Sequence, residues 1–310
     1  MALAQKPSAD MWHNLGNTQL IAGQLSAAEH AFRQALQHDP AHLRARTDLG
    51  VVLKEQGHLE AAKEHFSQAI AAQPDYADAH WNLALTLLMQ GDFERGWAEY
   101  EWRLHIPEIP TRQFDTPLWD GSPLAGRRLL ITAEQGLGDA IQFARFIPLV
   151  VRQCGAQAVF FESHPALVAL FGGLVEMASN GTVQPAVCEG STHAAFQLIP
   201  RGQPLPDFDR HLPLMSTPKR GQIEAVQLSS CVPYLMADDE RIHRWKASLL
   251  PHDGLQIGIC WQGNPKYPAD RRRSIPLPHF YELARLEWVT LYSLQHDPGR
   301  QHLLEAPSDV

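Results

Sequence analysis

The sequence has little of what secreted, membrane-spanning and metal-binding proteins require. Only four of its 310 residues are cysteine, and Cys154, Cys188, Cys231 and Cys260 lie far apart without a Cys-x-x-Cys spacing. This pattern predicts reduced thiols in a cytoplasmic protein rather than a disulfide framework or a zinc site. No apolar run approaches the roughly 20 residues that cross a bilayer, and no basic stretch followed by an apolar core opens the chain. We therefore expect neither a membrane span nor a secretory signal.

Positive charge is also scarce. Charged residues make up 19% of the chain, and 26 Lys and Arg stand against 34 Asp and Glu, a net charge of -8. This balance argues against an overall electrostatic grip on nucleic acid or on an anionic membrane. Hydrophobic residues make up 45%, enough for buried cores, and the length predicts about two domains.

The first third of the chain is a repeat with a period of 34 residues. Residues that share a position in successive units include Gly23, Gly57 and Gly91, and also Phe32, Phe66 and Tyr100. Apolar residues recur within each unit at the three- and four-residue spacing of a helix. The pattern predicts helices over residues 9–22, 25–38, 43–56, 59–72, 77–90 and 93–104. The glycines serve the turns, and the aromatic residues fill the seams between units.

Residues 9–104 resemble three tetratricopeptide repeats (TPRs), with Trp12-x-x-Leu15-Gly16 as the opening signature. The resemblance implies a helical solenoid. It either binds a protein or peptide partner in its groove, or it is a docking or dimer surface that belongs to the attached domain. The third unit carries Arg103 where the others carry alanine, as a terminal helix that caps the stack and docks on a following domain would. Scattered histidines on these helices do not indicate a metal site; they are His30, His38, His42, His58 and His65.

Residues 105–127 carry four prolines and are predicted to be a linker, with Leu118-Trp119-Asp120-Gly121 as an aromatic anchor for the next domain. A strand over 128–132, a helix over 140–151 interrupted at Pro148, a strand over 158–161 and a helix near 165–173 follow. This alternation predicts a parallel, doubly wound sheet within residues 128–250. The stretch 174–215 has no clear order.

A second alternation begins after a predicted helix at 237–249. Strands are expected over 256–261 and 289–294, with a helix near 277–286 between them. Residues 251–310 therefore read as the start of another Rossmann-like domain that the chain does not complete. The predicted fold class is α + α/β: a helical solenoid, a doubly wound Rossmann-like domain and the beginning of a second one.

The glycine turn Gly136-Leu137-Gly138-Asp139 lies between the first strand and its helix and has three interpretations. It partly matches the dinucleotide fingerprint, with Glu162 as the ribose-binding acid. However, Asp139 would repel a pyrophosphate at the helix N-terminus, and that helix end instead stabilises an ionised aspartate. Asp139 is then either a general base toward a hydroxyl or a helix cap.

The second candidate motif follows the strand at 256–261. Trp261-Gln262-Gly263-Asn264 is succeeded by Arg271-Arg272-Arg273 just before a helix, an arrangement that suits a diphosphate clamp. The alternative is a solvated basic loop. Parallel strands bind ligands at their carboxyl ends, so the sequence predicts that Asp139 and Arg273 lie on opposite walls of one cleft.

The order of these motifs resembles bacterial TPR proteins with a two-Rossmann (GT-B) glycosyltransferase domain related to lipopolysaccharide heptosyltransferases. It is also similar in layout to TPR-fused O-linked N-acetylglucosamine transferases. The resemblance implies an inverting, metal-independent transfer from a nucleotide-sugar, with Asp139 as base and no other cofactor. It assigns an acceptor loop of Gly136, Gly138 and Gln142, and a donor loop of Trp261, Gln262, Gly263, Asn264, Arg272 and Arg273.

The sequence departs from that family near its end. An Asp-Thr-x-x-x-His-type stretch and a following helix, which hold the nucleotide-sugar in such proteins, do not occur before Val310. We therefore expect a fragment or a truncated homologue with little transferase activity, which a version extended downstream would regain. The alternative function is a non-catalytic TPR interaction or scaffold protein.

Overall fold

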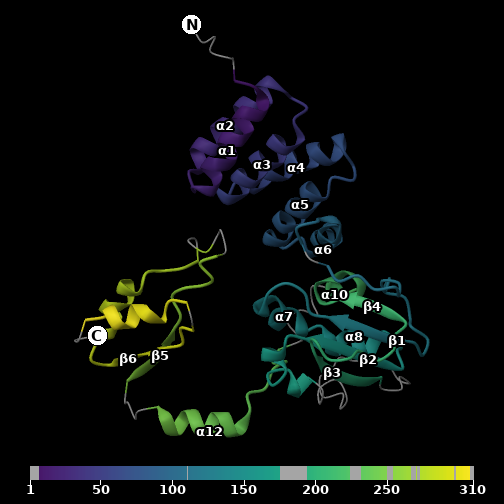
Figure 1. Cartoon of the computed structure of the whole chain (residues 1–310), viewed down its shortest axis with the longest axis vertical. Coiled ribbons are helices and arrows are strands. Elements are labelled where there is room, and N and C mark those ends of the chain that lie inside the picture. The colour runs from purple at the N-terminus through teal and green to yellow at the C-terminus, as the bar shows by residue number, and fades with distance from the viewer. Residues whose placement is uncertain are drawn as a thin grey trace. The chain divides into compact units, whose positions relative to one another are not determined.

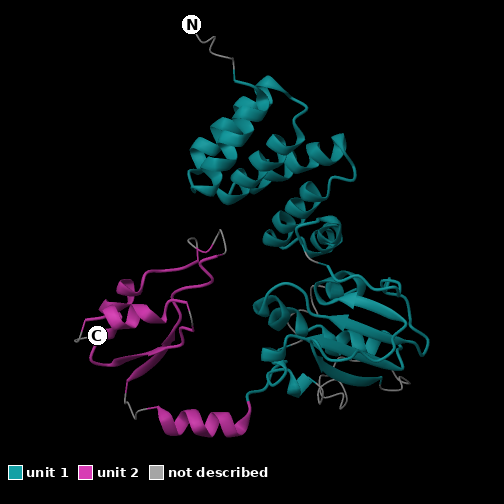
Figure 2. Ribbon diagram, viewed as in Figure 1, with its two compact units in different colours: residues 1–237 teal, residues 238–310 magenta. Residues whose placement is uncertain are grey.

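The chain divides into two compact units, residues 1–237 and residues 238–310 (Figures 1 and 2). The computed structural model describes residues 7–109, 111–174, 194–223, 232–249, 254–266, 270, 273–296 and 298–307. The first unit holds the predicted solenoid and the first parallel sheet, and the second unit holds a smaller sheet.

Six helices in consecutive pairs form the solenoid (Figure 1). They are α1 (Ala9–Ile21), α2 (Leu25–His38), α3 (Leu43–Glu55), α4 (Leu59–Ala72), α5 (Ala77–Met89) and α6 (Phe93–Tyr100). The predicted helices are confirmed, except that the last one tightens into the 3-10 turn η1 (Glu101–His105). Gly23, Gly57 and Gly91 have φ angles of 76°, 86° and 82°, so each turn uses the left-handed backbone that glycine allows.

Phe32 and Phe66 fill the inter-helix seams, as the repeat predicts. Both side chains are fully buried. A Cβ built on Gly16 would lie 2.5 Å from the Phe32 ring, and one on Gly50 would lie 2.5 Å from the Phe66 ring. The glycine of the first helix and the phenylalanine of the second helix therefore form one packing unit in each of the first two repeats.

Lys54 interrupts an apolar register, because Leu20 and Leu88 occupy the same position in the neighbouring repeats. Its ammonium donates to Asn82 Oδ1 over 3.0 Å, and burial lowers the pKa of Lys54 from 10.5 to about 8. The fold thus disfavours the charged form of this lysine. Burial of the charged lysine lowers the free energy of unfolding. This loss is fully present below pH 8 and disappears as the pH rises toward 10.5.

We predict that Lys54→Leu stabilises the chain at pH 7 by about 1–3 kcal/mol and has much less effect near pH 10. Urea unfolding at the two pH values measures the difference. As a control, Lys63→Leu removes an ion pair of 2.8 Å with Glu60 and should stabilise the chain at neither pH. An equal gain from Lys54→Leu at both pH values would contradict the prediction.

Within the described residues, the first sheet has four parallel strands in the order β3-β2-β1-β4. They are β1 (Arg128–Thr132), β2 (Ala158–Ser163), β3 (Ala195–Pro200) and β4 (Arg210–Pro213). β1 and β2 are nearly continuous buried runs, as central parallel strands are. β3 and β4 lie in the stretch that had no clear order in the sequence; β3 is partly exposed and β4 is only four residues long.

The helices beside this sheet differ from the prediction in two places. The helix expected over 140–151 is two helices, α7 (Leu137–Ala144) and α8 (Ile147–Gln153), and Pro148 lies in the first turn of the second, where proline is tolerated. Near 165–173, where one helix is expected, the described residues form the 3-10 turn η2 (Pro165–Leu167), a turn over 168–171 and helical backbone over 172–174. The expected helix is therefore interrupted at residues 168–171, before the two glycines.

The two faces of the sheet are covered differently. On one face, Leu129 and Ile131 pack in a cluster with Phe143 of α7 and Val150 of α8. On the other face, the apolar side chains that pack against the strands come from loops; they are Phe114, Leu205 and Phe208. The structure therefore establishes a parallel sheet with helices. A doubly wound sheet would have helices on both faces, and that arrangement stays a prediction.

The solenoid packs directly against this sheet region. Helix α10 (Thr217–Arg220), which follows the 3-10 turn η3 (Leu214–Ser216), lies against α6 (Figure 1). The predicted aromatic anchor is confirmed, since Trp119 is buried and its backbone N–H donates to His211 O over 2.8 Å. Tyr100 of the last repeat belongs to the same apolar cluster as Trp119.

The second unit contains one strand–helix–strand arrangement. Strands β5 (Leu255–Ile259) and β6 (Val289–Ser293) are parallel neighbours, and α12 (Asp239–Ser248) precedes them. The helix expected near 277–286 is the 3-10 turn η5 (Leu277–Phe280) followed by α13 (Tyr281–Ala284), with a last 3-10 turn η6 (Arg300–Glu305) after β6. Across the described stretches, none of the helices could cross a membrane.

Candidate functional site

The glycine turn begins helix α7. Gly136 is the N-cap, and its backbone N–H donates to Asp139 Oδ2 over 3.1 Å. The helix-cap interpretation of Asp139 is therefore confirmed, and a role as general base stays a prediction. Asp139 is half-buried, whereas Gln142 is exposed. A Cβ on Gly138 would meet nothing within 4 Å, so packing does not explain a glycine there.

A cavity of about 680 Å³ lies at the carboxyl ends of the four strands, where parallel sheets bind ligands. Asp139 does not line it, although the segment that leads from β1 to the glycine turn does. The lining residues come from the ends of all four strands and from the segment before β1; they include Thr111, Arg112, Thr132, Glu134, Gln135, Glu162, Arg201, Gln203 and Pro213. Of these, only Glu162 was a sequence candidate.

Opposite charges meet in this strand-end cavity. The carboxylate of Glu162 is buried and pairs with the guanidinium of Arg112, which is 49% exposed. Arg112 also lies over the ring of Phe114, 4.9 Å from its centroid. The guanidinium of Arg201 donates to the backbone oxygen of Ala133. Because Glu162 already pairs with an arginine, its carboxylate is not poised as a ribose-binding acid, which weakens the dinucleotide interpretation.

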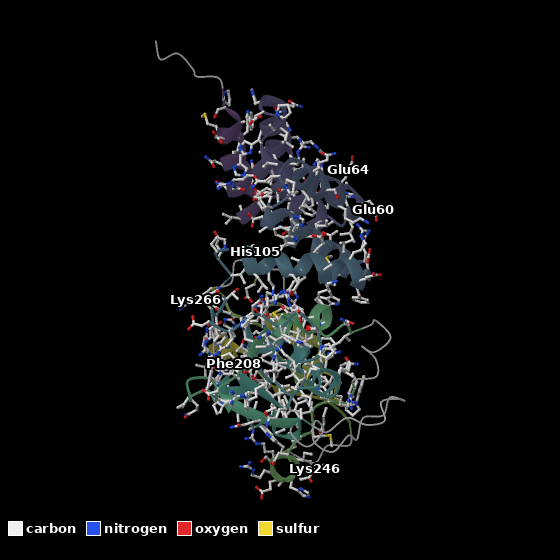
Figure 3. The ribbon with its side chains drawn as sticks, turned by 90° about the vertical axis from the view of Figure 1, so that its right-hand side faces the viewer. Glu60, Glu64, His105, Phe208, Lys246 and Lys266 are labelled. Carbon is white, nitrogen blue, oxygen red and sulfur yellow. The ribbon has the colours of Figure 1, made fainter. Side chains whose placement is uncertain are left out.

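A second cavity of about 420 Å³ adjoins the first, and both are lined by Thr111, Arg112 and Pro213. Trp102 and His105 of η1 form part of its wall, and Figure 3 marks His105 at the end of the solenoid. Burial lowers the pKa of His211, another wall residue, so its imidazole is mostly neutral at pH 7. The two cavities together extend from η1, at the end of the solenoid, to the carboxyl ends of the strands.

In the second unit, the loop after β5 is held by Gln295, a residue that sequence analysis missed. Gln295 is buried, and its Oε1 accepts hydrogen bonds from the backbone N–H groups of Trp261 (3.0 Å) and Gln262 (2.9 Å). Its Nε2 donates to Gln262 O over 2.9 Å. Trp261 is buried and its indole N–H donates to His302 Nδ1 over 3.2 Å. This loop is therefore ordered by buried contacts.

Gly263 and Arg273 meet in the same loop. Asp270 is buried and accepts a hydrogen bond from Arg273 Nε over 3.0 Å, and Ser274 Oγ accepts one from Gly263 N over 3.0 Å. A Cβ on Gly263 would lie 2.2 Å from Asp270 Oδ1, so only glycine fits there. The Arg273 side chain is 56% exposed. Asn264 makes a local turn contact with the N–H of Lys266 over 3.0 Å.

The predicted site residues thus fall into two groups. Asp139, with Gly136, Gly138 and Gln142, belongs to the first unit, and the loop from Trp261 to Arg273 belongs to the second. Arg272 lies outside the described residues. That Asp139 and Arg273 share one cleft stays a prediction. Among the residues that the structure describes, no three His, Cys, Asp or Glu side chains gather as a metal-ligand set.

Comparison with known proteins identifies the repeats. Two tetratricopeptide-repeat family models match residues 19–66 and 47–101, so the solenoid consists of TPRs. Protein FlbA of Caulobacter vibrioides is 27% identical over 223 residues, which cover 69% of this chain and 36% of FlbA. The chain therefore spans about a third of the length of that relative.

Two solved structures are also similar. The Sgt2 TPR domain from Aspergillus fumigatus has a TM-score of 0.30 and 25% identity, over 33% of this chain and 67% of that one. An O-GlcNAc transferase mutant from Thermobaculum terrenum has a TM-score of 0.31 and 19% identity, over 53% of this chain and 38% of that one.

Proposed function

We propose that this chain is part of a TPR-containing glycosyltransferase that moves a sugar from a nucleotide-sugar to an acceptor hydroxyl. One observation carries the proposal. In each of the two parallel sheets, a strand leads at its carboxyl end into a loop with one of the two groups that the reaction needs, a base or a diphosphate-binding cation. The loop after β1 leads to a carboxylate, Asp139, and the loop after β5 carries a guanidinium, Arg273. The resemblance of both motifs to heptosyltransferases supports the same roles.

In the proposed reaction, the acceptor binds in the strand-end cavity and extends past the segment that leads from β1 to the glycine turn, so that its hydroxyl reaches Asp139. The ionised Asp139 accepts the hydroxyl proton while the oxygen attacks the anomeric carbon, and the nucleoside diphosphate leaves from the opposite side. Arg273 holds the departing diphosphate, for which a guanidinium is well matched. Inversion at the anomeric carbon follows from this single displacement, which needs no metal.

We further propose that the reaction takes place in the cytoplasm and that the solenoid recruits a protein or peptide. The hydrogen bonds between His13 and Asp48 (2.7 Å) and between Lys54 and Asn82 (3.0 Å) link neighbouring repeats through α1, α3 and α5. These partly buried contacts join the first helices of successive repeats, and the second candidate function is a TPR scaffold without catalysis. Nucleotide-sugar binding separates the two, since a scaffold has no reason to bind one.

Donor binding tests the proposal directly. We expect isothermal titration of the 310-residue chain with UDP-, GDP- and ADP-sugars to reveal at least one ligand. Arg273→Gln should weaken its binding about tenfold or more, because a charged hydrogen bond contributes about 1.5–3 kcal/mol.

Arg285→Gln is the matched control. Arg273 pairs with Asp270 and Arg285 pairs with Glu282, each three residues away, and the arginine side chains are 56% and 43% exposed. Arg285→Gln should leave the dissociation constant unchanged. Absence of binding for every nucleotide-sugar, or an equal loss in both variants, would argue against the donor site.

A further inference from the structure

Arg103 is a fully buried arginine at the end of the solenoid. Its repeat position is occupied by Ala35 and Ala69 in the first two units, so the third repeat places a positive charge where the others need only a methyl group. A buried charge persists only where partners surround it.

Those partners come from both sides of the junction between solenoid and sheet. Arg103 Nη2 donates to Glu134 Oε1 over 2.6 Å and to Ser216 Oγ over 2.8 Å. Arg103 Nη1 donates to Glu101 Oε1 over 3.0 Å and to Tyr100 O over 3.3 Å. The guanidinium also lies 4.8 Å from the centroid of the Tyr100 ring. The solenoid end thus holds a carboxylate of the sheet domain.

Glu134 connects this contact to the site. It comes two residues after β1, lines the strand-end cavity and has only 8% of its side chain exposed. Its Oε1 also accepts the backbone N–H of Met215 over 3.1 Å, and Met215 lies directly after β4 in η3. Glu134 Oε1 therefore links Arg103 to the segments that follow the neighbouring strands β1 and β4.

The backbone of the next residue, Gln135, depends on how Glu134 is held. Gln135 has a φ of 57°, a conformation that a non-glycine residue keeps only where its surroundings hold it. Gly136, the N-cap of α7, and Asp139 follow immediately. The segment 133–139 therefore leaves β1 at a residue that Arg103 holds and passes through a strained position before it presents Asp139.

We infer that Arg103 is a positioning residue: it acts through Glu134 to fix the wall of the strand-end cavity and the glycine turn of Asp139. Without Arg103, the Glu134 carboxylate would be buried without its cation, and the segment 133–139 would relieve that cost by moving Glu134 toward water. The solenoid is then a structural part of the site and not only a partner-binding module. The effect on Asp139 rests on the proposed function; the effect on the loop does not.

Hydrogen exchange of the 310-residue chain tests the positioning role. In Arg103→Met, which keeps the apolar stem, we expect the amides of residues 133–140 and 214–216 to exchange at least tenfold faster, while those of residues 9–72 keep their rates. Arg220→Met is the control at the same junction: Arg220 bonds to Glu101 (2.6 Å) and Trp119 O (3.0 Å), and its loss should leave residues 133–140 unchanged.

Kinetics provide the second readout. In a version of the chain extended downstream, Arg103→Met should lower kcat for sugar transfer at least tenfold with the donor KM unchanged, because the proposed donor loop lies in the other unit. If Arg103→Met does not fold, Glu134→Gln tests the positioning role in its place. This variant removes the negative charge that Arg103 binds but keeps an oxygen that can accept from Met215 N. It should raise the exchange rates of residues 133–140 to a smaller extent.

Unchanged exchange at 133–140 in a folded Arg103→Met chain, or in Glu134→Gln where that chain does not fold, would overturn the inference. So would the same increase in Arg220→Met. Faster exchange at 133–140, together with no sugar transfer by a version of the chain extended downstream, would support the positioning role and reject the proposed function.

Discussion

Asp139→Asn should lower the rate of sugar transfer by about two to four orders of magnitude, the usual contribution of a positioned general base. The substitution is informative because it separates the two roles of this residue. Asparagine keeps a side-chain oxygen that accepts the Gly136 N–H, a contact of 3.1 Å in this structure, so helix α7 retains its cap. It cannot take a proton from a hydroxyl at neutral pH.

The measurement is single-turnover transfer with a radiolabelled nucleotide-sugar, which detects slow chemistry, on the 310-residue chain and on a version extended downstream. Asp92→Asn is the matched control, because Asp92 caps α6 through a hydrogen bond of 3.2 Å from Arg95 N and lies in the solenoid. It should leave both turnover and thermal stability close to those of the wild type. Transfer that survives Asp139→Asn would reject Asp139 as the base.

Phe66→Ala should lower the free energy of unfolding by about 3–5 kcal/mol, the cost of removing a large aromatic side chain from a packed core. Phe66 is fully buried between the helices of the second repeat, and its ring fits against Gly50 so closely that a Cβ there would lie 2.5 Å away. Urea unfolding followed by circular dichroism measures the change. Phe93→Ala, at a half-buried position of the third repeat, should cost clearly less.

A double-mutant cycle sharpens this test. Gly50→Ala alone should destabilise by about 1–3 kcal/mol, because its methyl group overlaps the Phe66 ring. In the Phe66→Ala background the same methyl group enters the space that the ring leaves, so Gly50→Ala should cost little there. Additive effects of the two substitutions would show that the residues do not form one packing unit.

The solenoid could be predicted almost completely from the sequence. Its helices depend on contacts between residues three, four and 34 positions apart, and the residues that make those contacts recur in all three repeats. Each of the first five helices ends within one residue of its predicted end. Arg103, the position where the third unit departs from the pattern, correctly indicated docking on the following domain.

The sheet could be predicted only where its strands are buried. β1 and β2 are apolar runs and were expected from the sequence. β3 exposes alternate residues and β4 spans four, so neither carries a strong local signal. The helix expected near 165–173 is interrupted by a turn over 168–171, and helical backbone begins only at Gly172.

By itself, the sequence determined the repeat architecture, the central strands and the turn that carries Asp139, because each depends on residues close together in the chain or on a fixed period. Only the tertiary structure decided what surrounds the strand-end cavity. Arg112 meets Glu162 across 50 residues, and Arg103 meets Glu134 across 31. In each pair the carboxylate is largely buried, where its attraction to the guanidinium is screened less than in water. The partners meet only when the strands lie side by side and the solenoid packs against them.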